Sequence, residues 1–216
     1  IDDLQMPPIL RYIEACFGWL FYNQKHRDSG LFIQRVIAAA TANIPDSIII
    51  KCTEQLDGAS TNNLKKKHTP FGENEIPSLA WTVSEEDVHK IKEFALIVQD
   101  ADVPMPSPIL HGLYYSIPSS CRSLTHSDLL SIKNDDNEAG SGMKYGLNFR
   151  KNLYSGARPI VNHGQHRYFY QLVGLERPVG LPGGVSLPQL INAMQGKIIA
   201  YGVWIGVYER LLHEDD

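Results

Sequence analysis

Residues 92–100 read KEFALIVQD, and five consecutive apolar residues, Phe94 to Val98, form the centre of this segment. Phenylalanine, isoleucine and valine favour extended backbone. A strand with one face in water alternates apolar and polar residues, whereas a run without alternation is typical of a strand covered on both faces. We therefore predict a buried strand here, with packed layers on either side of its sheet.

The rest of the chain contains more strand patterns than helix patterns. Apolar, β-branched and aromatic runs predict further strands at residues 46–52, 76–81, 111–118, 166–175 and 196–210, the last with glycine bends. Helices are predicted at residues 9–22, 31–43 and 186–194, the third with a capping-box pattern of Ser186 and Gln189. Residues 119–146 are polar and rich in turn formers, which predicts a loop. Because strands and helices do not alternate, a mainly β fold with an antiparallel sheet or sandwich is favoured over a doubly wound α/β fold.

The first predicted helix is amphipathic. Ile9, Ile13, Phe17 and Leu20 recur at helical spacing. We expect this apolar stripe to pack on the domain. A helix lying on a membrane surface is the weaker alternative, because the segment lacks the face rich in Lys and Arg that such helices use.

Length and net charge narrow the classes of function. With 216 residues, 43% of them hydrophobic, the chain can bury one core, so a single domain over residues 1–216 is predicted. A formal net charge of −4 and a pI near 6.1 argue against nucleic acid as a partner, since such binding depends on a basic face that neutralises phosphates. No apolar run is long enough to span a bilayer, so no transmembrane segment is expected.

The cysteines indicate the redox context. Cys16, Cys52 and Cys121 are odd in number and widely spaced, which predicts neither a disulfide framework nor a CxxC metal site. The absence of an Asn-x-Ser/Thr sequon favours a cytoplasmic location. The sequence begins with Ile1 instead of methionine, so secretion after removal of a signal peptide stays compatible with it.

A polar motif, VQDADVPMPSPILHG at residues 98–112, directly follows the buried strand. Asp100 and Asp102 bracket one alanine, and prolines at alternate positions stiffen the chain up to His111. Taken alone, the motif fits a polar turn, a divalent-metal site of the Asp-x-Asp type, or one half of a ligand site. The α/β nucleotide domain that usually carries the metal motif is missing, which disfavours the metal.

A second polar cluster lies in YSGARPIVNHGQHRYFYQL, residues 154–172. It contains Tyr154, Arg158, Pro159, His163, His166, Arg167 and Tyr168. His163 and His166 have the spacing of a metal-binding pair on one helical turn, but the glycine between them disfavours a helix, and no metal is predicted. The chain has no GxSxG elbow, and its glycine-rich stretches lack the lysine or the strand–turn–helix setting of nucleotide-binding loops, so no cofactor is predicted either.

Together the two motifs resemble the signatures of the phosphatidylethanolamine-binding protein (PEBP) family, which includes the Raf kinase inhibitor proteins and bacterial homologues. Residues 100–104, DADVP, are similar to the family's D-P-D-x-P, and His111 opens HGLYYSIP where the family often has HWVVYNIP. Residues 156–168 are similar to its second signature, close to G-P-x-P-P-x-G-x-H-R-Y. The resemblance is strongest to a fungal branch, some of whose members are encoded in secondary-metabolite clusters. It implies a PEBP-like antiparallel β-sandwich over residues 47–211, with an N-terminal helical extension over residues 1–46 and a flanking C-terminal helix.

Four residues depart from the family pattern. Ala101, Ala157 and Ile160 stand where the family has prolines, and Gly112 stands where it has tryptophan. The family pocket is a small surface cavity that binds phosphate-like or carboxylate anions. The missing tryptophan implies an altered and larger pocket wall, so binding of a phospholipid head group does not follow from the family alone.

The resemblance implies a ligand site formed by Asp100, Asp102, His111, Pro159, His166 and Tyr168. In it, Asp100 orients a histidine, His111 and His166 donate hydrogen bonds to ligand oxygens, and Tyr168 adds a hydroxyl. Arg167 is expected to brace Asp102 in a charge-assisted pair, and the loop around Pro159 to offer a backbone N–H. A buried hydrogen-bond network that holds no ligand is the alternative.

Two functions are compatible with this site. The first is binding of a small anion, a carboxylate, phosphate or lipid head group, in a fungal secondary-metabolite pathway. The second is an enzyme or enzyme accessory that promotes coupling or cyclisation of maleidride-type anhydride monomers, with His111, His166 and Asp100 as catalytic candidates and a ketosteroid-isomerase-like enzyme as a partner. Inhibition of a kinase through a protein surface would rest on fold analogy alone.

Overall fold

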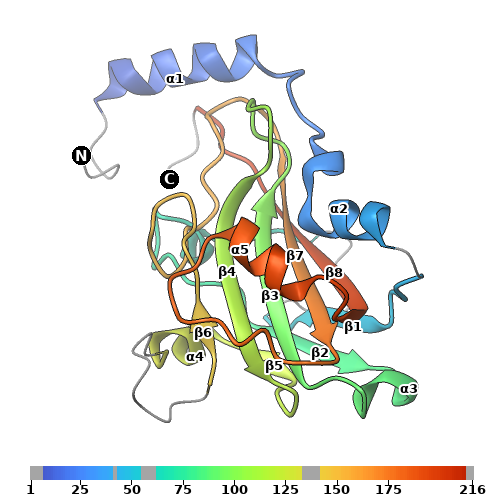
Figure 1. Ribbon diagram of the computed structural model, residues 1–216. Coiled ribbons are helices and arrows are strands. Elements are labelled where there is room, and N and C mark those ends of the chain that lie inside the picture. The colour runs from blue at the N-terminus through green and yellow to red at the C-terminus, as the bar shows by residue number, and fades with distance from the viewer. Residues whose placement is uncertain (1–6, 41–42, 55–61, 133–141, 213–216) are drawn as a thin grey trace.

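The buried apolar run is strand β3 (Glu93–Asp100), and all eight of its residues are buried in the computed structural model. It pairs antiparallel with β4 (Ile109–Pro118) on one side and with β7 (His166–Leu175) on the other. Two outer strands, β6 (Lys144–Tyr145) and β8 (Ile198–Tyr208), complete a five-stranded sheet of order β6-β4-β3-β7-β8 (Figure 1). The prediction of a strand covered on both faces is confirmed.

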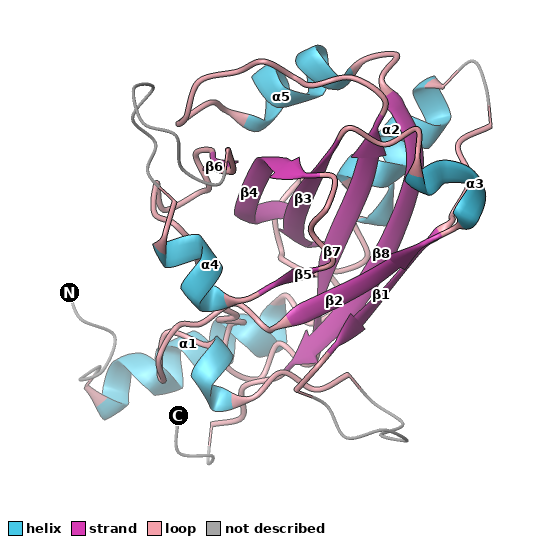
Figure 2. Cartoon of the chain, turned by 90° about the horizontal axis from the view of Figure 1, so that it is seen from below, coloured by secondary structure: helices cyan, strands magenta, loops and turns pink. Residues whose placement is uncertain are grey.

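A smaller antiparallel sheet packs on one face of the large one (Figure 2). It has the order β1-β2-β5 and is formed by β1 (Ile48–Cys52), β2 (Leu79–Val83) and β5 (Ser123–Leu124). Apolar side chains of both sheets, among them Ile50, Trp81, Phe94 and Leu96, share one core cluster. The two layers form the predicted β-sandwich.

Helices cover the opposite face of the large sheet (Figure 2). Here α2 (Phe32–Ala39) and α5 (Leu187–Met194) bury apolar side chains against Ala95 and Ile97, the residues of β3 that point to this face. Helix α5 begins with the predicted capping box of Ser186 and Gln189. The remaining helical segments are α1 (Pro8–Leu20), α3 (Glu85–Val88), α4 (His126–Leu130) and the 3-10 turns Asp28–Gly30 and Lys66–His68.

The structure describes residues 7–40, 43–54, 62–132 and 142–212. The predicted loop at residues 119–146 is wrong in part, because β5, α4 and β6 lie within it, while residues 133–141 lie outside the described ranges. These elements are too short to show a period in the sequence. A capping box of Thr125 and Asp128 starts α4, and Leu129 buries its side chain in the core.

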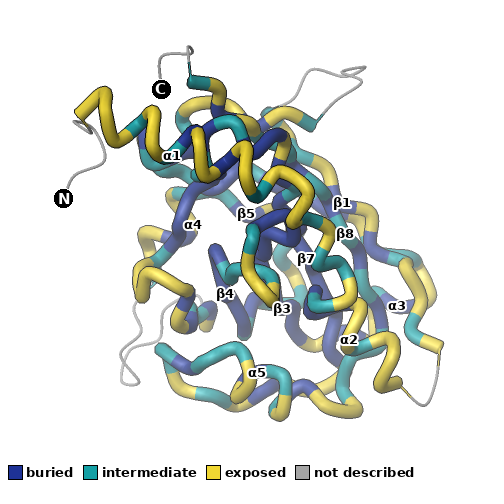
Figure 3. The backbone as a smooth tube through the Cα atoms, turned by 90° about the horizontal axis from the view of Figure 1, so that it is seen from above, coloured by how far each residue is buried: buried dark blue, intermediate teal, exposed yellow. Residues whose placement is uncertain are grey.

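The orientation of α1 differs from the expectation. Its predicted apolar stripe, Ile9, Ile13, Phe17 and Leu20, is exposed, and only Ala15 and Gly18 of this helix are buried (Figure 3). A Cβ atom at position 18 would lie 1.9 Å from the carbonyl oxygen of Val161, so only glycine permits this close approach. The helix therefore contacts the domain through its small and polar side. Within the described ranges, no helix combines the length and apolar character needed to cross a membrane.

Two buried glutamines of the large sheet fix the start of α2. Gln99 accepts a hydrogen bond from the backbone N–H of Phe32 at 2.8 Å, and Gln171 accepts one from Ile33 at 2.9 Å. The Gln171 amide also donates to Gln99 at 3.0 Å. These bonds satisfy N–H groups that a helix leaves unpaired in its first turn, since Leu31 provides no side-chain cap. They also set the path of the preceding residues, which cross the end of the sheet.

We expect Gln171→Met to lower the free energy of unfolding by about 1–3 kcal/mol, because it leaves the N–H of Ile33 and the amide oxygen of Gln99 with fewer partners in a buried place. Urea unfolding measures this loss. The control is Gln24→Met at an exposed glutamine, which is expected to stay within about 0.5 kcal/mol of the wild type. Equal stability of the two variants would contradict the capping role of Gln171.

Candidate functional site

The site lies where β3 ends and where β4 and β7 begin. In the antiparallel sheet these three strand ends meet at one edge, and Asp100 of β3 stands opposite Tyr168 of β7 and Ile109 of β4. Helix α1 crosses the same end of the molecule (Figure 1). Asp100, His111, His166 and Tyr168 are all buried here, so the structure brings together four of the six predicted site residues in one cluster.

A β-bulge brings His111 into this cluster. Gly112 stands opposite Val98, but the next paired residue of β4, Leu110, stands opposite Gln99, so His111 is the extra residue between two ladder pairs. A bulge changes the direction in which a side chain points. The His111 ring packs edge-on to the Tyr168 ring, with centroids 5.2 Å apart.

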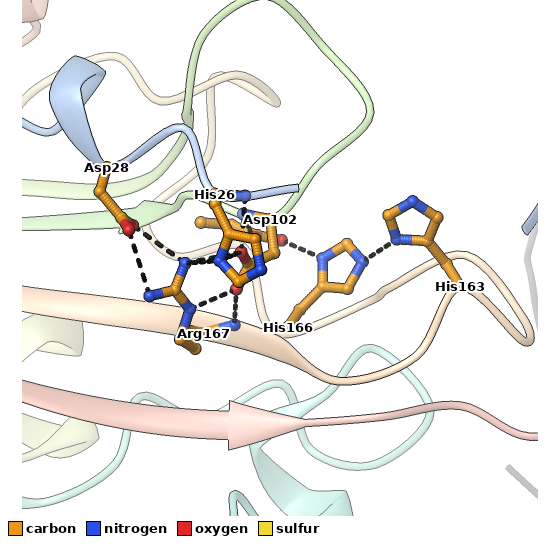
Figure 4. A network of polar contacts seen from close by, with 7 residues as sticks. His26, Asp28, Asp102, His163, His166 and Arg167 are labelled. Carbon is orange, nitrogen blue, oxygen red and sulfur yellow. Dashed lines mark hydrogen bonds and ion pairs between the residues drawn. The ribbon is translucent and has the colours of Figure 1, made fainter. Parts of the chain in front are cut away.

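The two carboxylates that follow β3 have separate roles. Asp100 accepts a hydrogen bond from the backbone N–H of Asp102 at 2.8 Å, and its other oxygen lies 2.8 Å from Nδ1 of His166. Asp102 accepts hydrogen bonds from Nε of Arg167 at 2.7 Å and from its Nη2 at 2.8 Å (Figure 4). The predicted contacts of Asp100 with a histidine and of Asp102 with Arg167 are both present.

Arg167 also holds the N-terminal segment against the site. Its guanidinium donates to Asp28 at 2.9 Å and to Nδ1 of His26 at 2.9 Å, while the backbone N–H of His26 donates to Asp102 at 3.0 Å (Figure 4). Burial opposes ionisation of Asp102, but the hydrogen bonds from Arg167 and His26 outweigh it and lower the pKa of this carboxyl. Hydrogen bonds to Asp102 in turn raise the pKa of Arg167. A charged pair therefore ties residues 26–28 to the loop after β3.

Two imidazoles continue from Asp100 toward α1. Nε2 of His166 lies 2.7 Å from Nδ1 of His163, and Nε2 of His163 lies 2.8 Å from the carbonyl oxygen of Phe21, the residue after α1 (Figure 4). These contacts link Asp100, through the two imidazoles, to the end of α1. Burial and the neighbouring His166 lower the pKa of His163.

His166 is therefore fully occupied by protein groups. Both of its ring nitrogens have partners, whereas the prediction gave one of them to a ligand oxygen. The reason is His163, which turns back over the strand start through Gly164, a glycine with a positive φ of 85°. Sequence reasoning noted His163 only as a metal ligand. Within the described ranges, no group of three or more His, Cys, Asp and Glu side chains is arranged to hold a metal ion.

His111 has one nitrogen without a partner. Its Nδ1 lies 2.6 Å from the carbonyl oxygen of Ser155, which can only accept, so Nδ1 carries the proton and Nε2 is a free acceptor in the neutral ring. Burial lowers the pKa of His111 and outweighs the Asp100 carboxylate and the hydrogen bond to Ser155, which raise it, while the nearby Arg150 lowers it further. At neutral pH the site thus presents an acceptor here and not the donor that was predicted.

The Tyr168 hydroxyl is the second polar group of interest. Its oxygen is buried and makes no hydrogen bond of good geometry to any described residue, although the Asp100 carboxylate and the backbone of Arg158 lie close enough to affect its pKa. Burial raises its pKa well above the ordinary tyrosine value, and the nearby Asp100 carboxylate raises it further. Asp100 also acts on the pKa of His111, which places both groups around the same carboxylate. A buried polar group of this kind is a common mark of a ligand or water site.

A turn at residues 148–152 forms the outer wall beside His111. The exposed Phe149 ring lies 5.3 Å from the His111 ring, and the exposed Arg150 guanidinium lies over Phe149 at 5.3 Å. Asn148 shapes the turn, because its side chain accepts from the N–H groups of Arg150 and Asn152 and donates to the carbonyl of His111. No sequence pattern singled out these residues, which carry neither periodicity nor a signature.

Two other residues of the predicted cluster bind protein groups beside the site. Pro159 is buried, and its carbonyl accepts from Arg210 at 3.0 Å, while the Tyr154 hydroxyl pairs with Tyr170 at 3.0 Å. At Gly112, a Cβ atom would meet the Tyr114 ring at 2.8 Å. The space that the missing tryptophan was expected to open is thus filled by Tyr114, and the expectation of an enlarged wall is wrong at this position.

Comparisons with known proteins match this chain to a family. The family model described as "Phosphatidylethanolamine-binding protein" matches residues 54–209. The "Phomoidride biosynthesis cluster protein B" of Fungal sp. (strain ATCC 74256) is 33% identical over 209 residues, which covers 94% of this chain and 97% of the relative. The protein of the same name from Talaromyces stipitatus is 28% identical over 208 residues, covering 94% and 83%. The crystal structure of a PEBP homologue from Chlamydia trachomatis aligns with a TM-score of 0.61 at 23% identity, covering 76% of this chain and 99% of that chain, which shows the same fold.

We expect Asp102→Asn to lower the free energy of unfolding by about 3 kcal/mol at pH 7, because it removes the buried one of the two carboxylates that pair with Arg167 and leaves only the half-exposed Asp28. The pKa of Asp102 is lower in the folded than in the unfolded chain. Its contribution is therefore present above the unfolded-state value near pH 4 and is lost as the pH falls through the folded-state pKa. Urea unfolding at several pH values should show the difference between wild type and variant shrinking below about pH 4.

The control for this measurement is Asp46→Asn at an exposed aspartate, which is expected to change stability by less than about 0.5 kcal/mol. A difference between wild type and Asp102→Asn that stays constant down to strongly acidic pH would rule out the ionised carboxylate as its source.

Proposed function

The chain belongs to the phosphatidylethanolamine-binding protein family, and we propose that its site binds a small carboxylic or phosphoric acid together with one proton. The observation that carries the proposal is a pair of polar atoms on two buried residues, Nε2 of His111 and the Tyr168 hydroxyl. The hydroxyl is buried without a hydrogen bond of good geometry, and Nε2 has no hydrogen bond to a described residue. One is an acceptor and the other a donor. An acid group with one O–H and one bare oxygen complements both.

The charges around the pair favour an anionic ligand. The Asp100 carboxylate accepts a hydrogen bond from the backbone N–H of Asp102 and lies 2.8 Å from Nδ1 of His166, and these contacts partly offset its negative charge toward a second anion. Arg150 lies on the exposed side, close enough to act on the pKa of His111. An entering anion meets this cation first, and a partly screened cation at the mouth of a site raises the local concentration of anions.

The proton requirement gives the binding a pH dependence. The pKa of His111 is lowered in the free protein, so at neutral pH the ring is neutral. An anion that binds to Nε2 must either bring its own proton or cause His111 to take one up. In both cases affinity rises as the pH falls toward the pKa of the ligand or of the occupied His111.

The names of the relatives support a place for this ligand in fungal secondary metabolism. Two proteins that align over 94% of this chain are named for a phomoidride biosynthesis cluster. We infer that the ligand is a carboxylated intermediate or product of such a pathway, in preference to a phospholipid head group. Phosphate-containing ligands are included in the test because the family is named for binding a phospholipid.

We expect carboxylates to raise the melting temperature of the protein. At about ten times Kd, a ligand stabilises the fold by about 1.4 kcal/mol, which is about 3–5 °C for a chain of this size. Thermal unfolding with malonate, succinate, citrate, inorganic phosphate and phosphoethanolamine separates carboxylate from phosphate and head-group binding. The shift should be larger near pH 5.5 than near pH 8.

Three variants connect the shift to the site. His111→Phe and Tyr168→Phe keep the rings and remove the two polar groups, and each should abolish or strongly reduce the shift. Arg150→Gln should weaken binding, whereas Arg35→Gln, at an exposed arginine of α2, should not. The proposal fails if no anion changes the melting temperature, or if His111→Phe responds like the wild type.

The relatives' names also favour a second candidate, in which the protein acts on the intermediate or assists an enzyme that does. A buried neutral imidazole with a free Nε2 can take a proton from a bound acid or stabilise an enol as it forms. The reaction would be coupling or cyclisation of maleidride-type anhydride monomers, with a ketosteroid-isomerase-like enzyme as the pathway partner.

We expect the wild type to increase the yield of coupled product from the monomers, with or without that enzyme, and His111→Phe to lose the increase. Product yield by mass spectrometry is the readout. If wild type, His111→Phe and His166→Ala all give the yield found without this protein, the chemical role is excluded while simple binding is not.

A further inference from the structure

Helix α1 is largely exposed (Figure 3), and most of the side chains that it exposes are apolar. Seven large apolar side chains of this helix are between 46% and 77% exposed, namely Ile9, Leu10, Tyr12, Ile13, Phe17, Trp19 and Leu20. Scattered exposed apolar residues are ordinary, but a contiguous patch of this size on a folded chain marks an interaction surface.

The orientation of the helix is fixed by its other side. Glu14 accepts a hydrogen bond from the buried Arg210 at 2.8 Å, and Gly18 packs directly on the backbone of Val161. At the end of the helix, the carbonyl of Phe21 bonds to His163 at 2.8 Å. These contacts hold the polar side of α1 against the domain, so the helix cannot turn its apolar face inward without breaking them.

The spacing of the exposed residues is that of a coiled-coil seam. Ile9, Ile13, Cys16 and Leu20 are separated by four, three and four residues, as the a and d positions of a heptad are. Leu10, Tyr12, Phe17 and Trp19 flank this seam, which we call the α1 seam. A helix with such a seam packs against another helix with the same periodicity.

The charges exclude some occupants. The seam and its flanks carry no charged residue, since the charged residues of the helix, Arg11 and Glu14, belong to the domain-facing side. Helices that lie on membranes use Lys and Arg on the polar side to hold anionic lipids. Here Arg11 donates a hydrogen bond to the backbone carbonyl of Leu211, and Glu14 accepts one from Arg210. The whole chain has a net charge of −4. A lipid surface is therefore disfavoured, and an uncharged apolar helix fits best.

We propose that the occupant is a second copy of this chain, with the two α1 helices antiparallel about a twofold axis. In this register Ile9 faces the partner's Leu20 and Ile13 faces the partner's Cys16, so all four layers are filled and each small Cys16 meets a larger Ile13. A parallel pair would instead place two cysteines in one layer and leave it underpacked.

The dimensions agree with such an interface. A cavity of about 480 Å³ lies beside the end of the helix, lined by Trp19, Leu20, Tyr22 and Asn23. In the antiparallel pair, the first turn of the partner's helix arrives at this end. Three of the seven exposed side chains are aromatic, a class that buries about 150–250 Å² when fully covered, and four are aliphatic. Together they supply an area on the order of the about 800 Å² per partner of a standard interface.

Sedimentation or light scattering of the whole chain at micromolar concentration tests the proposal. The wild type should have twice its chain mass of 24.2 kDa. Ile13→Glu should weaken the dimer at least about 100-fold, because it buries two unpaired charges per interface. It should fold normally, as the side chain is exposed in the monomer. The matched control is Ile49→Glu, at an isoleucine of β1 that is 62% exposed, and it should remain dimeric.

Oxidative cross-linking tests the register. In the antiparallel pair, Ile13→Cys places its new thiol opposite the partner's Cys16 and should form a covalent dimer, whereas Ile9→Cys faces the partner's Leu20 and should not. A monomeric wild type overturns the proposal, including the case in which the monomer binds a different pathway protein through α1. So does a dimer that survives Ile13→Glu, or one that the native Cys16 cross-links as readily as Ile13→Cys does.

Discussion

Asp100 and Asp102 leave the central strand as a pair, and each binds one of two consecutive residues of β7, His166 and Arg167. Successive residues of an extended chain point to opposite sides, so His166 and Arg167 lie on opposite sides of β7. The two carboxylates that bind them therefore act in different directions. Asp100 acts inward on the buried imidazoles. Asp102 acts outward on an arginine that also binds Asp28 of the N-terminal segment. The buried site and the N-terminal segment that crosses it therefore both depend on the end of β3.

Both buried carboxylates of the site have partners. Asp100 contacts the backbone N–H of Asp102 and the ring of His166, and Asp102 pairs with the charge of Arg167. The groups without a hydrogen bond of good geometry, Nε2 of His111 and the hydroxyl of Tyr168, are neutral. Such groups cost less to bury than an unpaired ion, yet they still favour a ligand that offers complementary hydrogen bonds. This explains how the cluster stays stable when empty and is still selective.

The N-terminal segment links the site with the surface of α1. The chain from Asp100 through His166 and His163 ends on the carbonyl of Phe21, directly after that helix. A change in the protonation of these groups would alter the hydrogen bond that attaches the end of α1, and the outer face of this helix carries the α1 seam. The two glutamines that hold the start of α2 fix the other end of the same segment. Residues 21–31 are thus held at both ends, which keeps the helix in one orientation.

The sequence by itself determined what depends on local pattern: the buried β3, the sandwich of antiparallel strands and the capped α5, because each follows from periodicity or from a capping pattern. The pairing of Asp102 with Arg167 followed from the resemblance of two motifs to the family signatures. Only the tertiary structure decided the rest. Helical spacing identifies the apolar face of α1 but not its direction, which is set by the backbone of Val161 at Gly18 and by Arg210 at Glu14. A bulge turned His111 inward, and His163 took the nitrogen of His166 that had been assigned to a ligand. These outcomes depend on contacts between segments far apart in the chain, and no local pattern encodes them.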